Sequence, residues 1–166
     1  ALRHALERDE FMLYLQPKLD LATGAVVGGE ALVRWVHPEK GFIGPDNFIP
    51  FAETTGFIRM LTIWMMEKVA ELSARLQAQG LRLKFSVNLS TRDLLDQELP
   101  NAFGAILERH RLTPAALCLE ITESAIMDDP ARAQSTLDRL AAMGFALSID
   151  DFGTGYSSLA YLKRLP

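Results

Sequence analysis

The chain has 166 residues, of which 17 are lysine or arginine and 21 are aspartate or glutamate, so its formal net charge is −4. This acidic balance argues against a general nucleic-acid-binding protein, which is usually basic, and no nucleic-acid polymer is expected as a partner. The single cysteine, Cys118, excludes a disulfide within the chain, and no apolar run reaches the length of a membrane span.

Five segments have the apolar content of β-strands, and helical segments separate most of them. The predicted strands are residues 11–19, 25–34, 82–88, 116–122 and 145–150. The predicted helices are residues 1–9, about 45–53, 57–79, a short segment after Ser90, about 99–111, a helix from Asp129 to Gly144 and a last one from Ser157. Residues 37–41 are predicted as a loop. The loop at residues 20–24 is so short that the first two strands must form an antiparallel hairpin.

The predicted strands share one pattern of side chains. In the strand at 82–88, Phe85 and Val87 share one face and Asn88 lies on the other. The same parity holds for the polar residues of three other strands, Glu30, Glu120 and Asp150. Apolar faces packed under helices and polar faces turned inward are typical of a barrel whose site lies at the C-terminal strand ends.

The polar residues at the strand ends have the chemistry of a metal site. Asn88, Glu120 and Asp150 follow one another at intervals of about 30 residues, the length of one strand–helix unit. We therefore expect these three residues and Glu30 at one structural level, where their oxygen atoms would bind Mg²⁺ or Mn²⁺. The alternative is that these side chains cap loops or bind surface water.

Six short motifs occur in a fixed order along the chain. They are Y-L-Q-P at 14–17, E-A-L-V-R-W at 30–35, F-I-P followed by A-E at 48–53, S-V-N-L-S at 86–90, E-I-T-E-S at 120–124 and D-D-F-G-T-G-Y-S-S-L at 150–159. This set resembles the EAL domain family, the bacterial cyclic di-GMP phosphodiesterases, over nearly the whole chain. The resemblance implies an α/β fold, a modified TIM (β/α)8 barrel whose first strand is antiparallel, in agreement with the predicted hairpin.

The resemblance also implies an activity, which is the hydrolysis of cyclic di-GMP to linear pGpG with two metal ions, Mg²⁺ or Mn²⁺. The residues that resemble the metal ligands are Glu30, Asn88, Glu120, Asp150 and Asp151. Asp150 would bridge both metals and Asp151 would serve the second, so that Glu30 and Asp150 are expected to be catalytic.

Other residues match positions that contact the substrate in the family. The residues expected to contact it are Gln16, Leu32 and Arg34, with Arg34 facing phosphate because a guanidinium fork matches phosphate oxygens. Glu123 either orients a ligand residue from behind or stabilises its own loop.

A complete barrel of this kind takes about 250 residues. We therefore expect residues 1–166 to be an incomplete EAL domain that lacks roughly the last three strand–helix units, and to be inactive alone. The family's lysine on the sixth strand, glutamate on the seventh and glutamine near the eighth would lie beyond Pro166.

The resemblance implies partners and a setting as well. They are cyclic di-GMP as ligand, a homodimer, an upstream sensor or GGDEF domain in the parent protein, and a cytoplasmic location, with a membrane tether through other domains left open. Two alternatives to an enzyme remain, namely a receptor that binds cyclic di-GMP without cutting it and a signalling scaffold. Nucleotide binding without turnover would identify the receptor, and the absence of nucleotide and metal binding would identify the scaffold.

Overall fold

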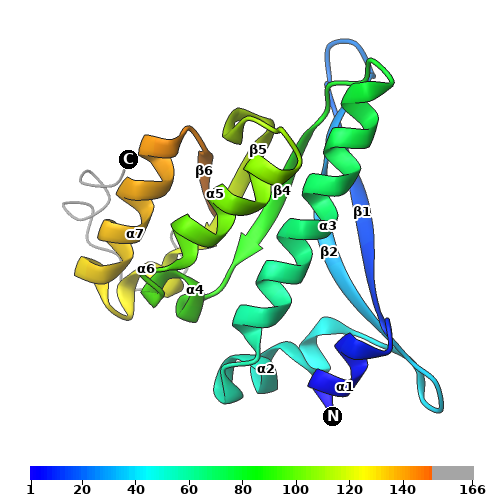
Figure 1. Cartoon of the computed structure of the whole chain (residues 1–166), viewed down its shortest axis with the longest axis vertical. Helices are drawn as coiled ribbons and strands as arrows, with labels where there is room; N and C mark the ends of the chain where they lie inside the picture. The colour runs from blue at the N-terminus through cyan, green and yellow to red at the C-terminus, as the bar shows by residue number, and fades with distance from the viewer. Residues whose placement is uncertain (151–166) are drawn as a thin grey trace.

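The computed structural model describes residues 1–150, with Asp150 described through its backbone alone, and shows a sheet with helices packed against it (Figure 1). Within this range the strands are β1 (Phe11–Leu19), β2 (Val26–His37), β3 (Gly41–Ile43), β4 (Lys84–Leu89), β5 (Leu117–Thr122) and β6 (Ala146–Asp150). Their order across the sheet is β1-β2-β4-β5-β6, and β3 pairs with β2. The β1–β2 pair is antiparallel and the β2–β4, β4–β5 and β5–β6 pairs are parallel, as predicted.

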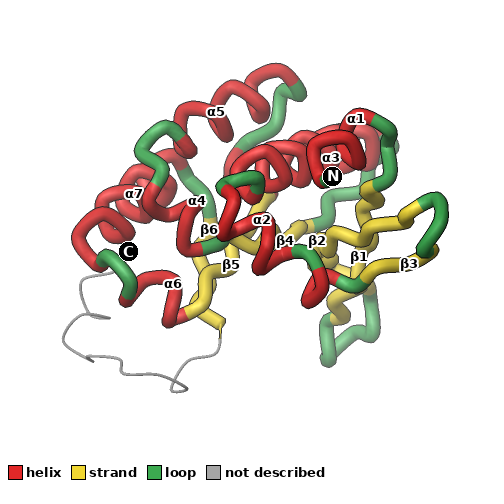
Figure 2. Tube along the Cα trace, turned by 90° about the horizontal axis from the view of Figure 1, so that it is seen from below, coloured by secondary structure: helices red, strands yellow, loops and turns green. Residues whose placement is uncertain are grey.

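The helices follow the strands in the alternation expected for a barrel of strand–helix units. They are α1 (Leu2–Glu7), α2 (Ile49–Thr55), α3 (Ile58–Ala78), α4 (Thr91–Leu95), α5 (Leu99–Arg109), α6 (Glu123–Met127) and α7 (Pro130–Met143), with the 3₁₀ turns η1 (Pro45–Asn47) and η2 (Pro114–Ala116). Seen from below, α3, α5 and α7 lie together on one side of the sheet (Figure 2). Gly56 and Gly144 end α2 and α7 in the left-handed conformation, which glycine adopts without strain.

Two apolar clusters fill the space between the layers. The larger one joins the apolar strand faces to α3, α5 and α7, and its members include Phe85, Val87, Leu117, Leu119, Ile121, Met66, Val69, Phe103, Leu107, Leu137 and Leu140. The smaller one lies near the N-terminus and includes Leu2, Phe11, Phe48, Ala52, Phe57 and Leu61. The strand residues of the larger cluster are those that the parity argument assigned to the apolar faces.

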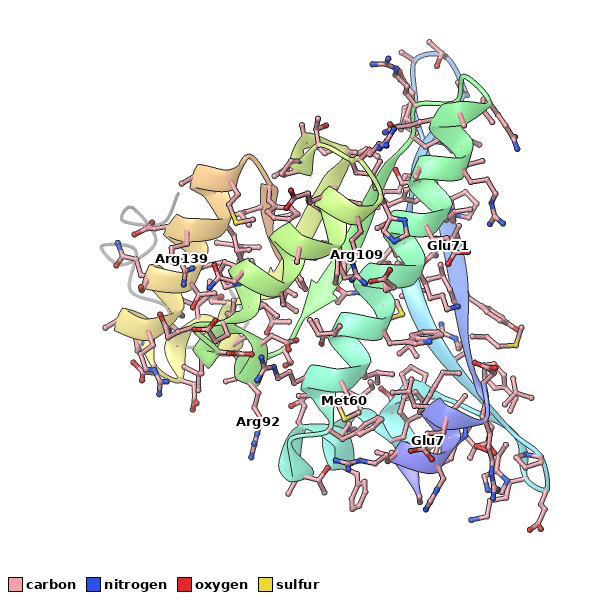
Figure 3. The ribbon with its side chains drawn as sticks, in the orientation of Figure 1. Glu7, Met60, Glu71, Arg92, Arg109 and Arg139 are labelled. Carbon is pink, nitrogen blue, oxygen red and sulfur yellow. The ribbon has the colours of Figure 1, made fainter. Side chains whose placement is uncertain are left out.

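Polar contacts tie the outer helices to one another. Arg139 of α7 donates to the carbonyl oxygen of Gln97 at 2.6 Å and to Asn101 Oδ1 at 3.0 Å. Arg109 of α5 reaches toward α3 (Figure 3), where its Nη2 lies 2.6 Å from Glu67 Oε2. These arginines connect neighbouring strand–helix units on the outer surface, away from the strand face that carries the polar residues.

Three local predictions were wrong. Residues 38–40 form the turn of a short β2–β3 hairpin, because His37 pairs with Gly41, whereas a loop had been predicted over the whole of 37–41. The predicted helix at about 45–53 is divided into η1 and α2 at Phe48, whose φ of −136° is not helical and whose ring is buried. The helix α6 was not predicted, because it starts directly from Thr122 at the end of β5 with no loop between them.

The fold class is the predicted one, an α/β structure of the modified TIM-barrel type with an antiparallel first strand. Asp151, the rest of the 150–159 motif and the helix predicted from Ser157 lie outside the described residues. Among residues 1–150, none of the helices combines the length and the apolar content needed to span a bilayer.

Candidate functional site

The strand ends place Glu30, Asn88 and Glu120 on the side of the sheet opposite α3, α5 and α7. Their sequence neighbours Ala31, Val87, Leu89, Leu119 and Ile121 belong to the core under these helices. Since successive side chains in a strand point to opposite faces, the three polar residues point the other way. The parity prediction is therefore confirmed for β2, β4 and β5.

The register shows that the four polar residues do not share one hydrogen-bonded row. Asn88 pairs with Glu120, but Glu30 pairs with Ser86, and Asp150 pairs with Thr122. Glu30 is thus two residues before the Asn88–Glu120 level along the ladder, and Asp150 is two residues beyond it. This stagger is what strand tilt produces in a barrel, because residues at one height along the axis are offset along the hydrogen-bonded rows.

Despite the stagger, the side chains of Glu30, Asn88 and Glu120 meet. Asn88 Nδ2 donates a hydrogen bond to Glu30 Oε1 at 3.3 Å. Glu30 and Glu120 are joined by a side-chain hydrogen bond, so the two carboxyl groups share a proton when one of them is protonated. The structure therefore brings together three of the five predicted metal ligands.

Lys18 completes this cluster and was missed in the sequence. Its Nζ donates to Glu120 Oε1 at 2.9 Å and to Ser86 Oγ at 2.7 Å. Lys18 lies two positions after Gln16 in β1, so the two side chains have the same parity, and this parity was the signal available in the sequence. The polar side chains of Lys18 in β1, Ser86 in β4 and Glu120 in β5 thus meet at one point.

The three titratable side chains of the cluster have shifted pKa values. Burial raises the pKa of the Glu30 carboxyl, and the hydrogen bond with Glu120 raises it further. Burial by itself would raise the pKa of Glu120 too, but hydrogen bonds with Lys18 and Glu30 outweigh it and lower the pKa. The pKa of Lys18 is raised, because its contacts with Glu120 exceed the opposing effect of burial. On acidification Glu30 is therefore protonated before Glu120, which keeps its charge to lower pH beside the ammonium.

The residues expected to contact the substrate lie along β1 and β2. Gln16 is paired directly with Glu30 across the hairpin. Leu32 and Arg34 line a cavity of about 290 Å³ that Asn88 also borders. The Arg34 guanidinium lies 6.0 Å from the centre of the Tyr14 ring, and its Nη1 donates to the Val33 carbonyl oxygen at 2.8 Å.

Asp93 also borders this cavity, and the sequence analysis did not single it out. Asp93 is 1% exposed, and its Oδ2 accepts hydrogen bonds from Thr62 Oγ1 at 2.8 Å and from the Ser90 backbone nitrogen at 2.9 Å. Ser90 Oγ accepts in return from the Asp93 backbone nitrogen, so this pair forms a capping box at the start of α4. Burial raises the pKa of Asp93 to about 6.

Glu123 lies at the first position of α6 and is 2% exposed. Its neighbour Thr122 caps the helix, since Thr122 Oγ1 accepts from the Ala125 nitrogen at 3.2 Å. The predicted ligand Asp151 and the side chain of Asp150 lie outside the described residues.

The donor set fits a divalent cation in kind. Two carboxylates and the carboxamide oxygen of Asn88 are hard oxygen donors, the type that Mg²⁺ prefers, and the ammonium of Lys18 shows that a cation is accommodated at Glu120. Within residues 1–150, no three His, Cys, Asp or Glu side chains gather closely enough to hold a metal ion. The carboxylates of the described residues are therefore too few to make a complete metal shell by themselves.

The comparisons with known proteins agree with the motifs. The EAL domain profile matches residues 1–166. The bifunctional diguanylate cyclase/cyclic di-GMP phosphodiesterase MucR of Pseudomonas aeruginosa is 43% identical over 166 residues, covering 99% of this chain and 24% of MucR. The cyclic di-GMP phosphodiesterase NbdA of the same organism is 45% identical, over 99% of this chain and 21% of its own length. The chain thus spans about a quarter of these curated relatives.

Solved structures show the same similarity in three dimensions. The phosphodiesterase PaMucR in complex with c-di-GMP superposes with a TM-score of 0.91 and 44% identity, covering 99% of this chain and 67% of that one. The FimX EAL domain from Pseudomonas aeruginosa bound to c-di-GMP superposes with a TM-score of 0.87 and 27% identity, covering 99% of this chain and 66% of that one.

Proposed function

The chain belongs to the EAL domain family, and we propose that it hydrolyses cyclic di-GMP to linear pGpG as part of an intact domain. The observation that carries this proposal is the convergence of Glu30, Asn88 and Glu120 on the inner face of the strands. Relatives that share more than two fifths of its residues are named cyclic di-GMP phosphodiesterases, which supports the same reaction.

The proposed metal ligands are Glu30, Asn88, Glu120, Asp150 and Asp151, with Asp150 shared between two ions. Bound Mg²⁺ or Mn²⁺ ions would supply a water of lowered pKa and neutralise charge on the reacting phosphate. Glu120 and Glu30 would each contribute carboxylate oxygens from neighbouring positions on the inner face. Asn88 holds Glu30 in place through its carboxamide. Glu30 and Asp150 are the proposed catalytic residues.

The proposed substrate contacts are Gln16, Leu32 and Arg34. The guanidinium of Arg34 presents a planar fork of donors that matches phosphate oxygens. Arg34 is one of the residues that line the cavity that Asn88 also borders. Leu32 contributes apolar surface to the same cavity. We assign Glu123 the role of orienting the ligands of β5, because it is buried directly after that strand.

A receptor that binds without hydrolysis is the second candidate. The similarity to the FimX EAL domain bound to c-di-GMP supports nucleotide binding, which an enzyme and a receptor share. In residues 1–150, Glu30, Asn88 and Glu120 all retain oxygen-bearing side chains at the proposed ligand positions. Ligand positions that are intact wherever they can be inspected favour hydrolysis over binding alone.

The length of the relatives supports a larger protein. MucR is described as bifunctional, and this chain covers 24% of it. We propose that residues 1–166 are the first part of one EAL domain. We further propose that the domain works in a homodimer, in a cytoplasmic setting, beside an upstream sensor or GGDEF domain.

The test is turnover by the full-length protein. Cyclic di-GMP is incubated with the protein and Mg²⁺ or Mn²⁺, the products are separated by chromatography, and a matched reaction contains EDTA. We expect pGpG with either metal and none with EDTA. Folded protein that binds the nucleotide but forms no product with both metals would exclude the enzyme and leave the receptor, and protein that binds neither nucleotide nor metal would leave the scaffold.

A further inference from the structure

Lys18 reaches across the sheet to a carboxylate three strands away. It lies in β1, opposite Gly28 of β2, while its ammonium contacts Ser86 of β4 and Glu120 of β5. Neighbouring strands are about 4.8 Å apart, so β1 and β5 would be separated by roughly 14 Å in a flat sheet. The contact therefore depends on the curvature of the sheet toward its inner face.

Gly28 keeps the path of Lys18 open. It has no side chain on the face that Lys18 crosses. A Cβ atom at this position would lie 1.9 Å from the Lys84 carbonyl oxygen, so β2 and β4 approach too closely here for any other residue. The glycine that allows the close strand pairing thus also leaves room for the lysine.

The ammonium is the cation of a cluster whose other charged groups are acidic. Glu30 and Glu120 bring two carboxyl groups together, and the Glu120 side chain is only 13% exposed. The Lys18 side chain is 44% exposed, so it has open space beside its present position. Glu120 is thus held by a cation that has open space beside it.

We propose that Lys18 is the built-in counter-ion of the metal site, which holds Glu120 in the metal-free protein and leaves it when a divalent cation binds. The inference rests on the proposed metal site but not on the proposed hydrolysis. An Mg²⁺ ion binds a carboxylate oxygen at about 2.0–2.1 Å, and the ammonium already contacts Glu120 Oε1 at 2.9 Å. The two cations repel each other at such a short separation, so they exchange.

This exchange predicts that one substitution, Lys18→Met, lowers the stability of the metal-free protein but raises its affinity for a divalent cation. Lys18→Met keeps most of the apolar stem and removes the charge. Without the ammonium, the metal-free protein retains two neighbouring carboxyl groups with no cation, so it should be less stable. A divalent cation would no longer compete with the ammonium, so it should bind more tightly. A lysine that only supported the fold would not strengthen metal binding when it is removed.

The experiment uses the full-length protein with three variants, Lys18→Met, Lys18→Arg and the exposed-lysine control Lys40→Met. Calorimetric titration with Mn²⁺, without nucleotide, should give a Kd about tenfold lower for Lys18→Met, and a Kd near the wild-type value for the other two. In EDTA, the melting temperature of Lys18→Met should fall by roughly 2 °C or more. A Kd that is unchanged or higher in Lys18→Met would overturn the proposal.

A second measurement needs no loss-of-charge variant. Lysine side chains of the wild-type protein are labelled as ¹³C-dimethylamines, and the Lys18 signal is identified by its absence from Lys18→Arg. The Lys18 signal should shift with Mg²⁺ saturation while the Lys40 signal stays fixed. A fixed Lys18 signal in protein that binds Mg²⁺ would overturn the counter-ion role alone, whereas wild-type protein that binds no divalent cation would overturn the metal site as well.

Discussion

The carboxyl groups of Glu120 and Asp93 belong to neighbouring strand–helix units but have different partners. Glu120 faces the open side of the sheet, where the Lys18 ammonium holds its pKa low. Asp93 is enclosed between α3 and α4, where its partners are a neutral hydroxyl and a backbone amide, and burial raises its pKa to about 6. A carboxylate near a strand end is therefore not by itself a candidate ligand. A cationic partner and an open face distinguish Glu120, the proposed ligand, from Asp93, which supports the fold.

The largest expected effect comes from Glu30, which lies with Glu120 on the open face of the sheet. Glu30→Ala in the full-length protein should lower the rate of cyclic di-GMP hydrolysis about 100-fold or more, because a lost ligand removes part of the clamp on the phosphate. Its stability in EDTA should be unchanged or slightly higher, since Glu120 loses a neighbouring acid. Glu39→Ala, in the exposed turn before β3, is the matched control. A Glu30→Ala protein with more than about a tenth of the wild-type rate would contradict the assignment.

The next largest effect concerns the pH dependence of stability and the buried carboxyl group of Asp93. The folded protein holds the Asp93 proton up to about pH 6, whereas the unfolded chain releases it near the ordinary value of 3.8. The stability from this group is therefore complete below about pH 4 and is lost as the pH rises through 6. Asp93→Asn removes this titration and keeps the oxygen acceptor. The variant should match the wild type at pH 4 and exceed its free energy of unfolding by up to about 3 kcal/mol at pH 7.

Urea unfolding in EDTA at several pH values measures this difference. The exposed-aspartate variant Asp46→Asn serves as the control, and its difference from the wild type should stay small and constant. An Asp93→Asn difference that does not change between pH 4 and pH 7 would show that Asp93 does not titrate as its burial implies.

A smaller effect separates the hydrogen bonds of Asp93 from its charge. At pH 5, where the carboxyl group is neutral, Asp93→Ala should lower the free energy of unfolding by about 2 kcal/mol. It breaks the capping box of α4 and leaves the buried hydroxyl of Thr62 without its acceptor. Adding Thr62→Val should restore part of the loss, because the unpaired hydroxyl is then removed as well. Hydrolysis per folded molecule should persist, and its loss would place Asp93 in the reaction rather than in the fold.

Most of the fold followed from local patterns. The helix predicted at 57–79 is α3, one residue shorter at each end, because its apolar residues recur every three or four positions and Gly80 follows it. The alternation in β5 predicted which residues are buried, and Leu117, Leu119 and Ile121 are all in the core. The spacing of apolar residues and the position of a chain-breaking glycine are properties of the local sequence, so these elements could be predicted from it.

The arrangement of the site could be predicted less completely from the sequence. The two-residue stagger of Glu30 against Asn88 depends on the tilt of the strands, which no single segment encodes. Lys18 enters the site only because the sheet curves and the residue opposite it is Gly28, two conditions set by the assembled sheet. The meeting of Glu30, Asn88 and Glu120 was predicted from parity, but their roles as metal ligands remain predictions.

The smallest effect is expected from a third carboxyl group, Glu67 of α3, which contacts the cation of Arg109 and the ring of His110 but lies on the outer helical layer. Arg109 Nη2 lies 2.6 Å from its Oε2, and His110 Nε2 lies 2.7 Å from its Oε1. The Glu67 side chain is 33% exposed, and pairs of this kind contribute about 0–1 kcal/mol because water and salt screen them. Glu67→Ala should therefore change the free energy of unfolding by less than about 1 kcal/mol, with less effect at high salt, and should leave hydrolysis unchanged. If it lowered the rate as much as Glu30→Ala, cationic partners on any face would suffice to define the site, and the inner face of the strands would lose its special status.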